Sequence, residues 1–287
     1  NYNKGDFQIY GNWGSSAKGH SDNLGIFGNL GYKFNEKTIF SSHLRGDKHK
    51  YSQENITYRL NLTKLINNFA LSISESTGLR HPDLYVLHGG NTGGTFKSMA
   101  TTKPETSLTR EASLKYYFSD DVSFQTTAYK GTISDVLNRG TATQGYNEII
   151  DIKQEGLENS FVLKDDFQRL SLSNTFSKSR EDDGSPQLRR PEQQFGVKYS
   201  RKFITNIFGP FDLNYDYRHV GKVEDWKHGS FRAQVDSSDI MNLSISKDLF
   251  GNKWSLNILN LTDEAYQRPD TYNQEGRRIG LSFRNKY

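Results

Sequence analysis

Histidine and aromatic side chains in one long polar stretch have the residue types and spacing that best suit ligand chemistry. Residues 76–107 carry His81, Tyr85, His88 and Asn91. Two histidines seven residues apart can ligate a haem iron through imidazole nitrogens; alternatively, both histidines cap and pack a loop. Structureless loops longer than about 12–15 residues are usually functional or disordered. We therefore predict ligand contacts in this stretch.

A second candidate for ligand binding lies in the polar stretch 221–238. It carries Trp226, His228 and Arg232. An indole beside a guanidinium suits a large polar ligand, through cation–π contacts and hydrogen bonds. The alternative, which is left equally open, is that these side chains are solvent-exposed loop residues without a ligand. Tyr272, in the last polar stretch, completes the predicted set of ligand-binding residues.

Elsewhere in the chain, few residues are spaced as catalytic groups or as ligands of a bound metal ion would be. The acidic doublets at 120–121, 165–166 and 182–183 lie among turn residues, where Asp typically hydrogen-bonds its own backbone. Residues 181–184 supply too few alternating oxygen ligands for a calcium loop. The chain has no cysteine, which excludes thiolate metal sites and disulfides. We expect no catalytic residue, no metal site and no cofactor.

The elements that would position these residues are β-strands with one apolar and one polar face. In residues 278–287, Ile279, Leu281, Phe283 and Tyr287 share one parity, and mostly polar or cationic residues occupy the other. Period-two segments of about ten residues separated by turn residues are the signature of transmembrane strands. A soluble sandwich or propeller is the alternative, but no repeat of about 40–50 residues supports a propeller.

Composition agrees with a barrel. The mean hydropathy is −0.78, as expected when only every second strand residue is apolar. The net charge of +4 is dispersed along the chain, whereas a nucleic-acid binder concentrates its basic residues, so we predict no nucleic-acid partner. The sequence has no initiator Met and no signal peptide, which predicts a processed or truncated piece.

Short and long connections alternate along the chain. The short ones are 35–37, 66–68, 119–121, 164–166, 206–210 and 251–252, and the long ones are 14–22, 46–54, 76–107, 138–147, 181–190, 221–238 and 267–275. Barrels have short periplasmic turns and longer extracellular loops. The alternation predicts one all-β domain, an antiparallel up-and-down transmembrane barrel of about 14 strands.

The alternation also predicts which side chains face lipid and which face the lumen. The lipid-facing set is Leu213, Tyr215, Tyr217, Leu256 and Ile258, and the lumen-facing set is Asn214, Asp216, Ser255 and Asn257. Arg59, Glu111, Lys115 and Arg284 are expected to solvate the lumen. A register slip of one residue would reverse every one of these assignments.

Several short motifs carry a family resemblance. Residues 76–87 (S-T-G-L-R-H-P-D-L-Y-V-L) resemble the G-F-R-x-P-x-L-Y-x-L segment of TonB-dependent outer-membrane transporters. Further segments follow in the family's order: K-P-E-T at 103–106, Y-N-E at 146–148, L-R-R-P at 188–191, N-I-L-N-L-T-D-E-A-Y at 257–266 and E-G-R-R at 275–278. Each motif alone is weak, but their fixed order over more than half of the chain is specific.

The resemblance implies a fold, a location and partners. The family barrel has 22 strands and a plugged lumen, so residues 1–287 would be its C-terminal portion, without the plug and the first strands. The expected location is the bacterial outer membrane, as a multi-pass protein. The expected partners are outer-membrane lipid, the TonB complex through the plug region, the barrel-assembly machinery and a small-molecule ligand.

The resemblance also implies active uptake of a scarce large ligand. Cobalamin or a ferric siderophore is the expected cargo, so the transported ligand can contain cobalt or iron; haem ranks third. A self-contained passive porin of about 14 strands is the alternative function. Gly280, Phe283 and Tyr287 are expected to form the signal for barrel assembly, although Asn285 stands where the family usually has an aromatic.

Overall fold

A single curved β-sheet dominates the computed structural model, which describes residues 2–10, 16–52, 54–82, 103–139, 146–227 and 231–285. Fourteen strands form this sheet, confirming the all-β fold and the strand number. They are β1 (Tyr2–Tyr10), β2 (Ser16–Asn35), β3 (Thr38–His49), β4 (Asn55–Ile66), β5 (Phe69–Arg80), β6 (Glu105–Tyr117), β7 (Val122–Arg139), β8 (Tyr146–Lys164), β9 (Gln168–Glu181), β10 (Gln193–Thr205), β11 (Gly209–Val220), β14 (Ser238–Leu249), β15 (Asn252–Leu259) and β16 (Arg278–Asn285). Across the described residues, no helix is long and apolar enough to cross a membrane.

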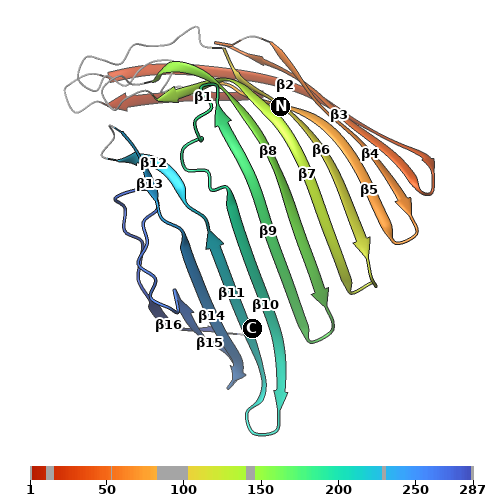
Figure 1. The fold of residues 1–287 in the computed structure, drawn as a ribbon, viewed down its shortest axis with the longest axis vertical. Coiled ribbons are helices and arrows are strands. Elements are labelled where there is room, and N and C mark those ends of the chain that lie inside the picture. The colour runs from red at the N-terminus through yellow and green to blue at the C-terminus, as the bar shows by residue number, and fades with distance from the viewer. Residues whose placement is uncertain are drawn as a thin grey trace.

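The strands follow one another up and down, and each pairs antiparallel with its neighbours in the chain. The sequential order is interrupted once. The strands β12 (Val223–Lys227) and β13 (Phe231–Val235) form a separate two-stranded sheet, so β11 pairs with β14. Figure 1 shows the large sheet bending into an open wall, with the small sheet inside one end of the curve. Within the described residues, no pairing joins β1 to β16.

Turn chemistry places the short connections, and all six lie where the sequence predicts them. Asp165 shows the local cause: its carboxylate accepts the backbone N–H groups of Phe167 and Gln168 at 2.8 and 2.9 Å. In the 206–210 and 251–252 turns, Gly209 and Gly251 have φ angles of +63° and +77°, which an L side chain would strain. The turns therefore need no tertiary contact to form.

Several long connections are shorter than the sequence predicts, whereas the last one spans 260–277 and is longer than the predicted 267–275. The strand β2 begins at Ser16, inside the predicted loop 14–22, because its polar start pairs with β1. The predicted loop 221–238 contains the β12–β13 hairpin. Strand pairing beyond the membrane needs no apolar alternation, so the sequence pattern underestimates strand length there.

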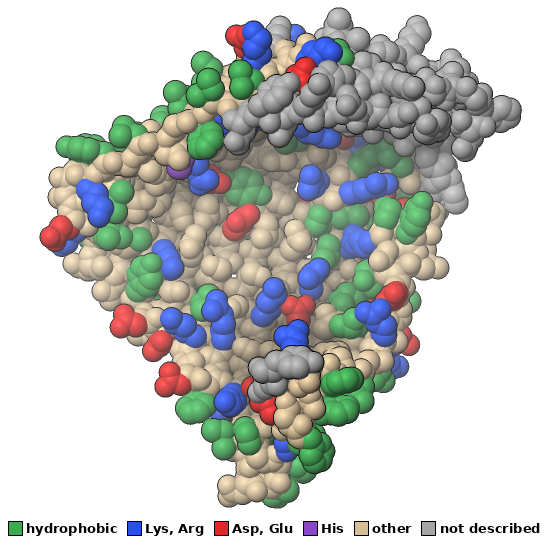
Figure 2. Space-filling view, turned by 180° about the vertical axis from the view of Figure 1, so that it is seen from behind, with side chains coloured by type: hydrophobic (Ala, Val, Ile, Leu, Met, Phe, Trp, Pro, Cys, Tyr) green, Lys and Arg blue, Asp and Glu red, His purple; other side chains and the backbone are tan. Residues whose placement is uncertain are grey.

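The two faces of the sheet differ as predicted. On β11, β14 and β15, Asn214, Ser244 and Asn257 lie side by side, and the Ser244 hydroxyl donates to the Asn257 carbonyl at 2.8 Å. With Asp216, they line a hollow of about 730 Å³. Figure 2 shows a hollowed face on which Lys and Arg side chains stand among other polar groups. The lumen assignment of Asn214, Asp216 and Asn257 is confirmed.

Large apolar side chains remain uncovered on the opposite parity. Ile26, Ile56 and Leu281 are 73%, 72% and 70% exposed. Among the residues whose burial the structure describes, few apolar side chains are buried: Pro104, Ile150, Ile152, Val223 and Val235. A soluble protein rarely exposes so many contiguous apolar residues, whereas a membrane wall presents them to lipid.

The Leu256→Arg substitution tests this orientation. Leu256 lies opposite Ile245 and Leu281 on the apolar face. Arginine there should lower the free energy of unfolding by roughly 2–4 kcal/mol if the site is near the midplane. Denaturant titration of the full receptor in lipid vesicles measures the change. The control is Ser255→Arg, on the adjacent lumen-facing position, which should cost far less; equal losses would contradict the assignment.

Candidate functional site

Three segments meet at the end of the sheet opposite the short turns. They are residues 181–192, the β12–β13 hairpin and residues 260–277, and we call them the loop cluster. Two hydrogen bonds donated by backbone N–H groups show the contacts between them. Arg189 N–H donates to the backbone carbonyl of Glu224 at 2.8 Å, and Asp270 N–H donates to the Asp225 carboxylate at 2.9 Å. The hairpin is therefore held on two sides.

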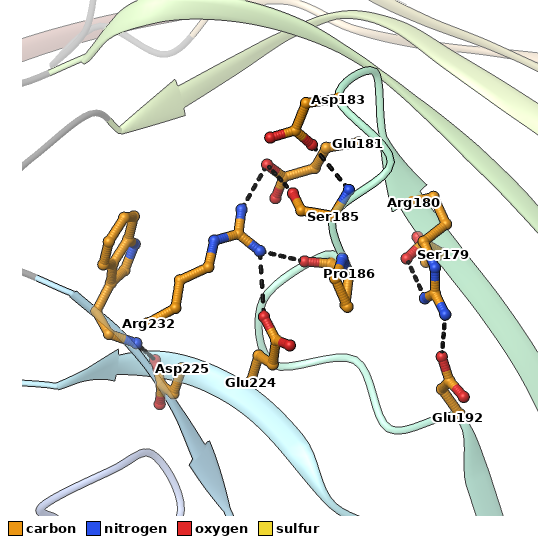
Figure 3. Close-up of polar contacts among 11 residues, drawn as sticks. Ser179, Arg180, Glu181, Asp183, Ser185, Pro186, Glu192, Glu224, Asp225 and Arg232 are labelled. Carbon is orange, nitrogen blue, oxygen red and sulfur yellow. Dashed lines mark hydrogen bonds and ion pairs between the residues drawn. The ribbon is translucent and has the colours of Figure 1, made fainter.

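Arg232 joins the hairpin to the 181–192 segment (Figure 3). Its guanidinium pairs with Glu181 at 2.7 Å and with Glu224 at 3.4 Å. It also donates to the carbonyl of Pro186 at 2.5 Å, and its charge lies 5.9 Å from the centre of the Trp226 ring. These contacts engage Nη1 and Nη2 of Arg232 and hold the hairpin against the 181–192 segment.

Asp225 is the buried centre of the loop cluster. Its side chain is 1% exposed and accepts Arg189 Nε at 2.7 Å. It also accepts the backbone N–H groups of Trp226 and Asp270 at 2.8 and 2.9 Å. Burial opposes ionisation of Asp225, but these hydrogen bonds outweigh it and lower the carboxyl pKa.

Arg268 secures the opposite side of the hairpin. Its Nη2 donates to the carbonyls of Val220, Gly221 and Asp236 at 3.3, 3.1 and 3.3 Å. Burial lowers the pKa of this guanidinium. The main chain thus supplies acceptors for Nη2, whereas Nη1 is buried with no hydrogen-bond partner in the described residues.

An acidic pocket opens beside Arg268. It has a volume of about 620 Å³, and its lining includes Asp236, Asp263, Glu264, Tyr266, Asp270 and Gln274. In the described residues, no group of three or more His, Asp or Glu side chains is arranged to hold a metal ion. The pocket therefore offers polar contacts to a ligand.

The structure brings some of the predicted ligand residues together. Trp226 and Arg232 lie in the hairpin, and Tyr272, 66% exposed, lies in the adjoining segment 260–277. Tyr85, His88, Asn91 and His228 lie outside the described residues, as does Tyr287 of the predicted assembly signal. Ligand binding by these residues stays a prediction.

His81 lies far from the loop cluster in strand order, just after β5. Its Nδ1 is 2.6 Å from the Ser52 hydroxyl, and its ring stacks on His49 with centroids 4.4 Å apart. Its Nε2 is buried, with no hydrogen-bond partner in the described part of the chain. Burial, and then the neighbouring His49 ring, lower the pKa of His81. A haem iron bound by His81 would need access to this buried Nε2.

Sequence reasoning missed Asp225 and Arg268. Both lie within predicted loops, and neither has a neighbour in the sequence that indicates burial. The one available signal is Arg189 in the L-R-R-P motif, since a motif arginine at a loop exit indicates a fixed partner. The structure identifies that partner as Asp225.

Sequence comparison decides the family. The family described as TonB dependent receptor-like, beta-barrel, matches residues 1–261. The chain belongs to this family. Its members are outer-membrane transport receptors rather than enzymes, so the predicted location and the non-enzymatic class are confirmed. Because short turns of such barrels are periplasmic, the loop cluster of this TonB-dependent receptor lies on the extracellular side.

Solved structures share the fold. The siderophore receptor PirA of Acinetobacter baumannii is 18% identical with a TM-score of 0.75, covering 93% of this chain and 46% of PirA. The ferripyoverdine receptor of Pseudomonas aeruginosa is 12% identical with a TM-score of 0.75, covering 94% and 39%. The copper transporter OprC is 15% identical with a TM-score of 0.72, covering 92% and 48%. No curated protein matches the sequence.

The chain spans less than half the length of these solved transporters. Identities this low establish the fold alone. The family match shows the family membership, and the solved structures show the all-β wall. The cargo, the plug and the TonB contact are proposed below.

Proposed function

We propose that the complete receptor takes up a ferric siderophore across the outer membrane, with energy from the TonB system. The family match over residues 1–261 carries the proposal. Two fold relatives are a siderophore receptor and a ferripyoverdine receptor, which favours an iron chelate. Because OprC is a copper transporter, copper is an alternative cargo. Cobalamin and then haem rank after it as further alternatives.

In this proposal, the loop cluster forms one wall of the extracellular ligand site. Salt bridges of Arg232 and Asp225 preorganise the hairpin, so binding would order few side chains. Tyr272 is exposed and available for contact. The ordered wall suits a large, rigid chelate more than a small ion.

The plug and its partner complete the proposed transport cycle. Residues 1–287 form the C-terminal part of the barrel, and the TonB complex acts through a plug region outside this chain. A passive porin of about 14 strands fits less well, because β1 and β16 are not paired with each other in the described residues. Unsatisfied strand edges in hydrocarbon cost several kcal/mol per backbone group.

A cargo panel tests the proposal. Deletion of residues 83–102 from the full receptor, or the double change His81→Ala and His88→Ala, should weaken binding without preventing assembly. Equilibrium binding of ferric siderophores, cobalamin and haem, together with growth of a receptor-deficient strain on each, measures the effect.

The outcomes separate the cargo classes. Wild-type affinity for every ligand after the deletion would refute a ligand role for residues 83–102. A large loss for haem alone after the double change would move haem to first place. Uptake that continues without TonB would favour the porin.

A further inference from the structure

A row of charged side chains crosses five strands on the lipid-facing side of the wall. Glu75, Arg110, Lys130, Glu155 and Lys178 lie directly opposite one another from β5 to β9. Their parity is opposite to that of Ser160 and Ser171, which line the hollow of the concave face. Because successive side chains of a strand point to opposite faces, the row faces outward.

The row marks the upper limit of the apolar band. On each of the five strands, it holds the first charged residue met on the outward face when moving away from the short turn. The next outward row toward the short turns consists of Ile73, Ala112, Ala128, Leu157 and Phe176. The charged row therefore lies at the boundary between hydrocarbon and the extracellular headgroups.

Cations predominate at this boundary. One step further from the short turns, Lys153 and Arg180 face each other on β8 and β9. We call Arg110, Lys130, Lys153, Lys178 and Arg180 the basic strip. Glu75 and Glu155 are the acidic members of the charged row. An excess of positive charge at a fixed membrane depth attracts anionic headgroups.

Three cations of the basic strip make no ion pair with the residues that the structure describes. Arg110 pairs with Glu75 at 2.7 Å, and Arg180 pairs with Glu192. Lys130, Lys153 and Lys178 are exposed and make no ion pair within the part of the chain that the structure describes. Figure 3 shows Arg180 and Glu192 well apart from the Arg232 network, although Glu181 is the next residue.

We propose that the basic strip binds the phosphorylated sugar headgroup of an outer-leaflet lipid. Lys130 and Lys178 lie two strands apart, about 10 Å at the usual strand spacing, so one headgroup with two phosphates can contact both. The apolar row beneath the strip receives the acyl chains. Binding there would anchor the barrel at a fixed depth and is independent of which cargo the receptor carries.

Native mass spectrometry of the full receptor with diphosphorylated lipid A tests the proposal. The triple change Lys130→Gln, Lys153→Gln and Lys178→Gln should weaken lipid A binding about tenfold or more at low salt. The matched control removes the same charge from the lumen face: Lys115→Gln, Lys198→Gln and Lys202→Gln should bind as the wild type does. Dephosphorylated lipid A should bind all three proteins equally weakly.

Two results would overturn the proposal: wild-type lipid A affinity in the strip variant, or an equal loss in the lumen control. A second variant covers failure of the triple variant to fold. Glu155→Gln removes an acidic side chain between Lys130 and Lys178, so it should strengthen lipid A binding several-fold. Unchanged or weaker binding by Glu155→Gln would also count against the basic strip.

Discussion

Removal of residues 283–287 should leave the receptor unfolded in the periplasm instead of inserted in the outer membrane. The cause is the loss of three of the eight residues of β16, which pairs with β15 from Arg278, opposite Leu259, to Asn285, opposite Asn252. The truncation also removes the Phe283 ring, whose centroid lies 5.6 Å from that of Trp254. Without these contacts, the edge of β15 would enter hydrocarbon with unsatisfied backbone groups.

Outer-membrane fractionation and heat-modifiable electrophoretic mobility measure this outcome. Tyr287→Phe keeps an aromatic at the final position and should assemble as the wild type does. Gly280 and Phe283 belong to the same predicted assembly signal, and Phe283 is 67% exposed on the lipid-facing parity. Normal insertion of the truncated receptor would show that β16 is dispensable for assembly.

Asp225→Ala opens the loop cluster while leaving the barrel wall folded. The substitution removes the acceptor of the Trp226 and Asp270 N–H groups and the partner of Arg189. Loss of these charge-assisted hydrogen bonds should cost about 3–5 kcal/mol of local stability. Amide hydrogen exchange in residues 223–235 should accelerate more than about a hundredfold, with no change in β14 and β15.

The control for this change is Asp236→Ala, near the end of the same hairpin. Asp236 is 88% exposed and pairs with Lys222 at 3.5 Å, so its removal should change stability by under about 1 kcal/mol. Equal exchange rates in the Asp225 and Asp236 variants would mean that the hairpin is held by other contacts.

Acid should reproduce the effect of Asp225→Ala. The folded pKa of Asp225 lies below its ordinary value of 3.8. The carboxylate therefore stabilises the loop cluster fully above that value, and this stability is lost as pH falls through the folded pKa. Protease cleavage of the hairpin should rise below about pH 4 in the wild type, whereas Asp225→Asn should lack this dependence.

Alternation and turn chemistry in the sequence were enough to predict the strand number, the short turns and the two faces of the wall. Each depends on local chemistry: the alternation of Leu213, Asn214 and Tyr215, or the hydrogen bonds of Asp165 to its own turn. Period two leaves only one register that keeps apolar side chains in lipid. A single chain therefore suffices to predict these features.

The way the extracellular segments meet could not be predicted and is seen only in the folded chain. Arg189 and Asp225 are 36 residues apart, and Arg232 and Glu181 are 51 apart. Pairings over such distances depend on how strands bring separate loops together, and polar loop sequences have no periodicity that encodes them. The basic strip likewise depends on the register of β5–β9. Each strand contributes only one or two of its cations, and strand pairing brings them side by side.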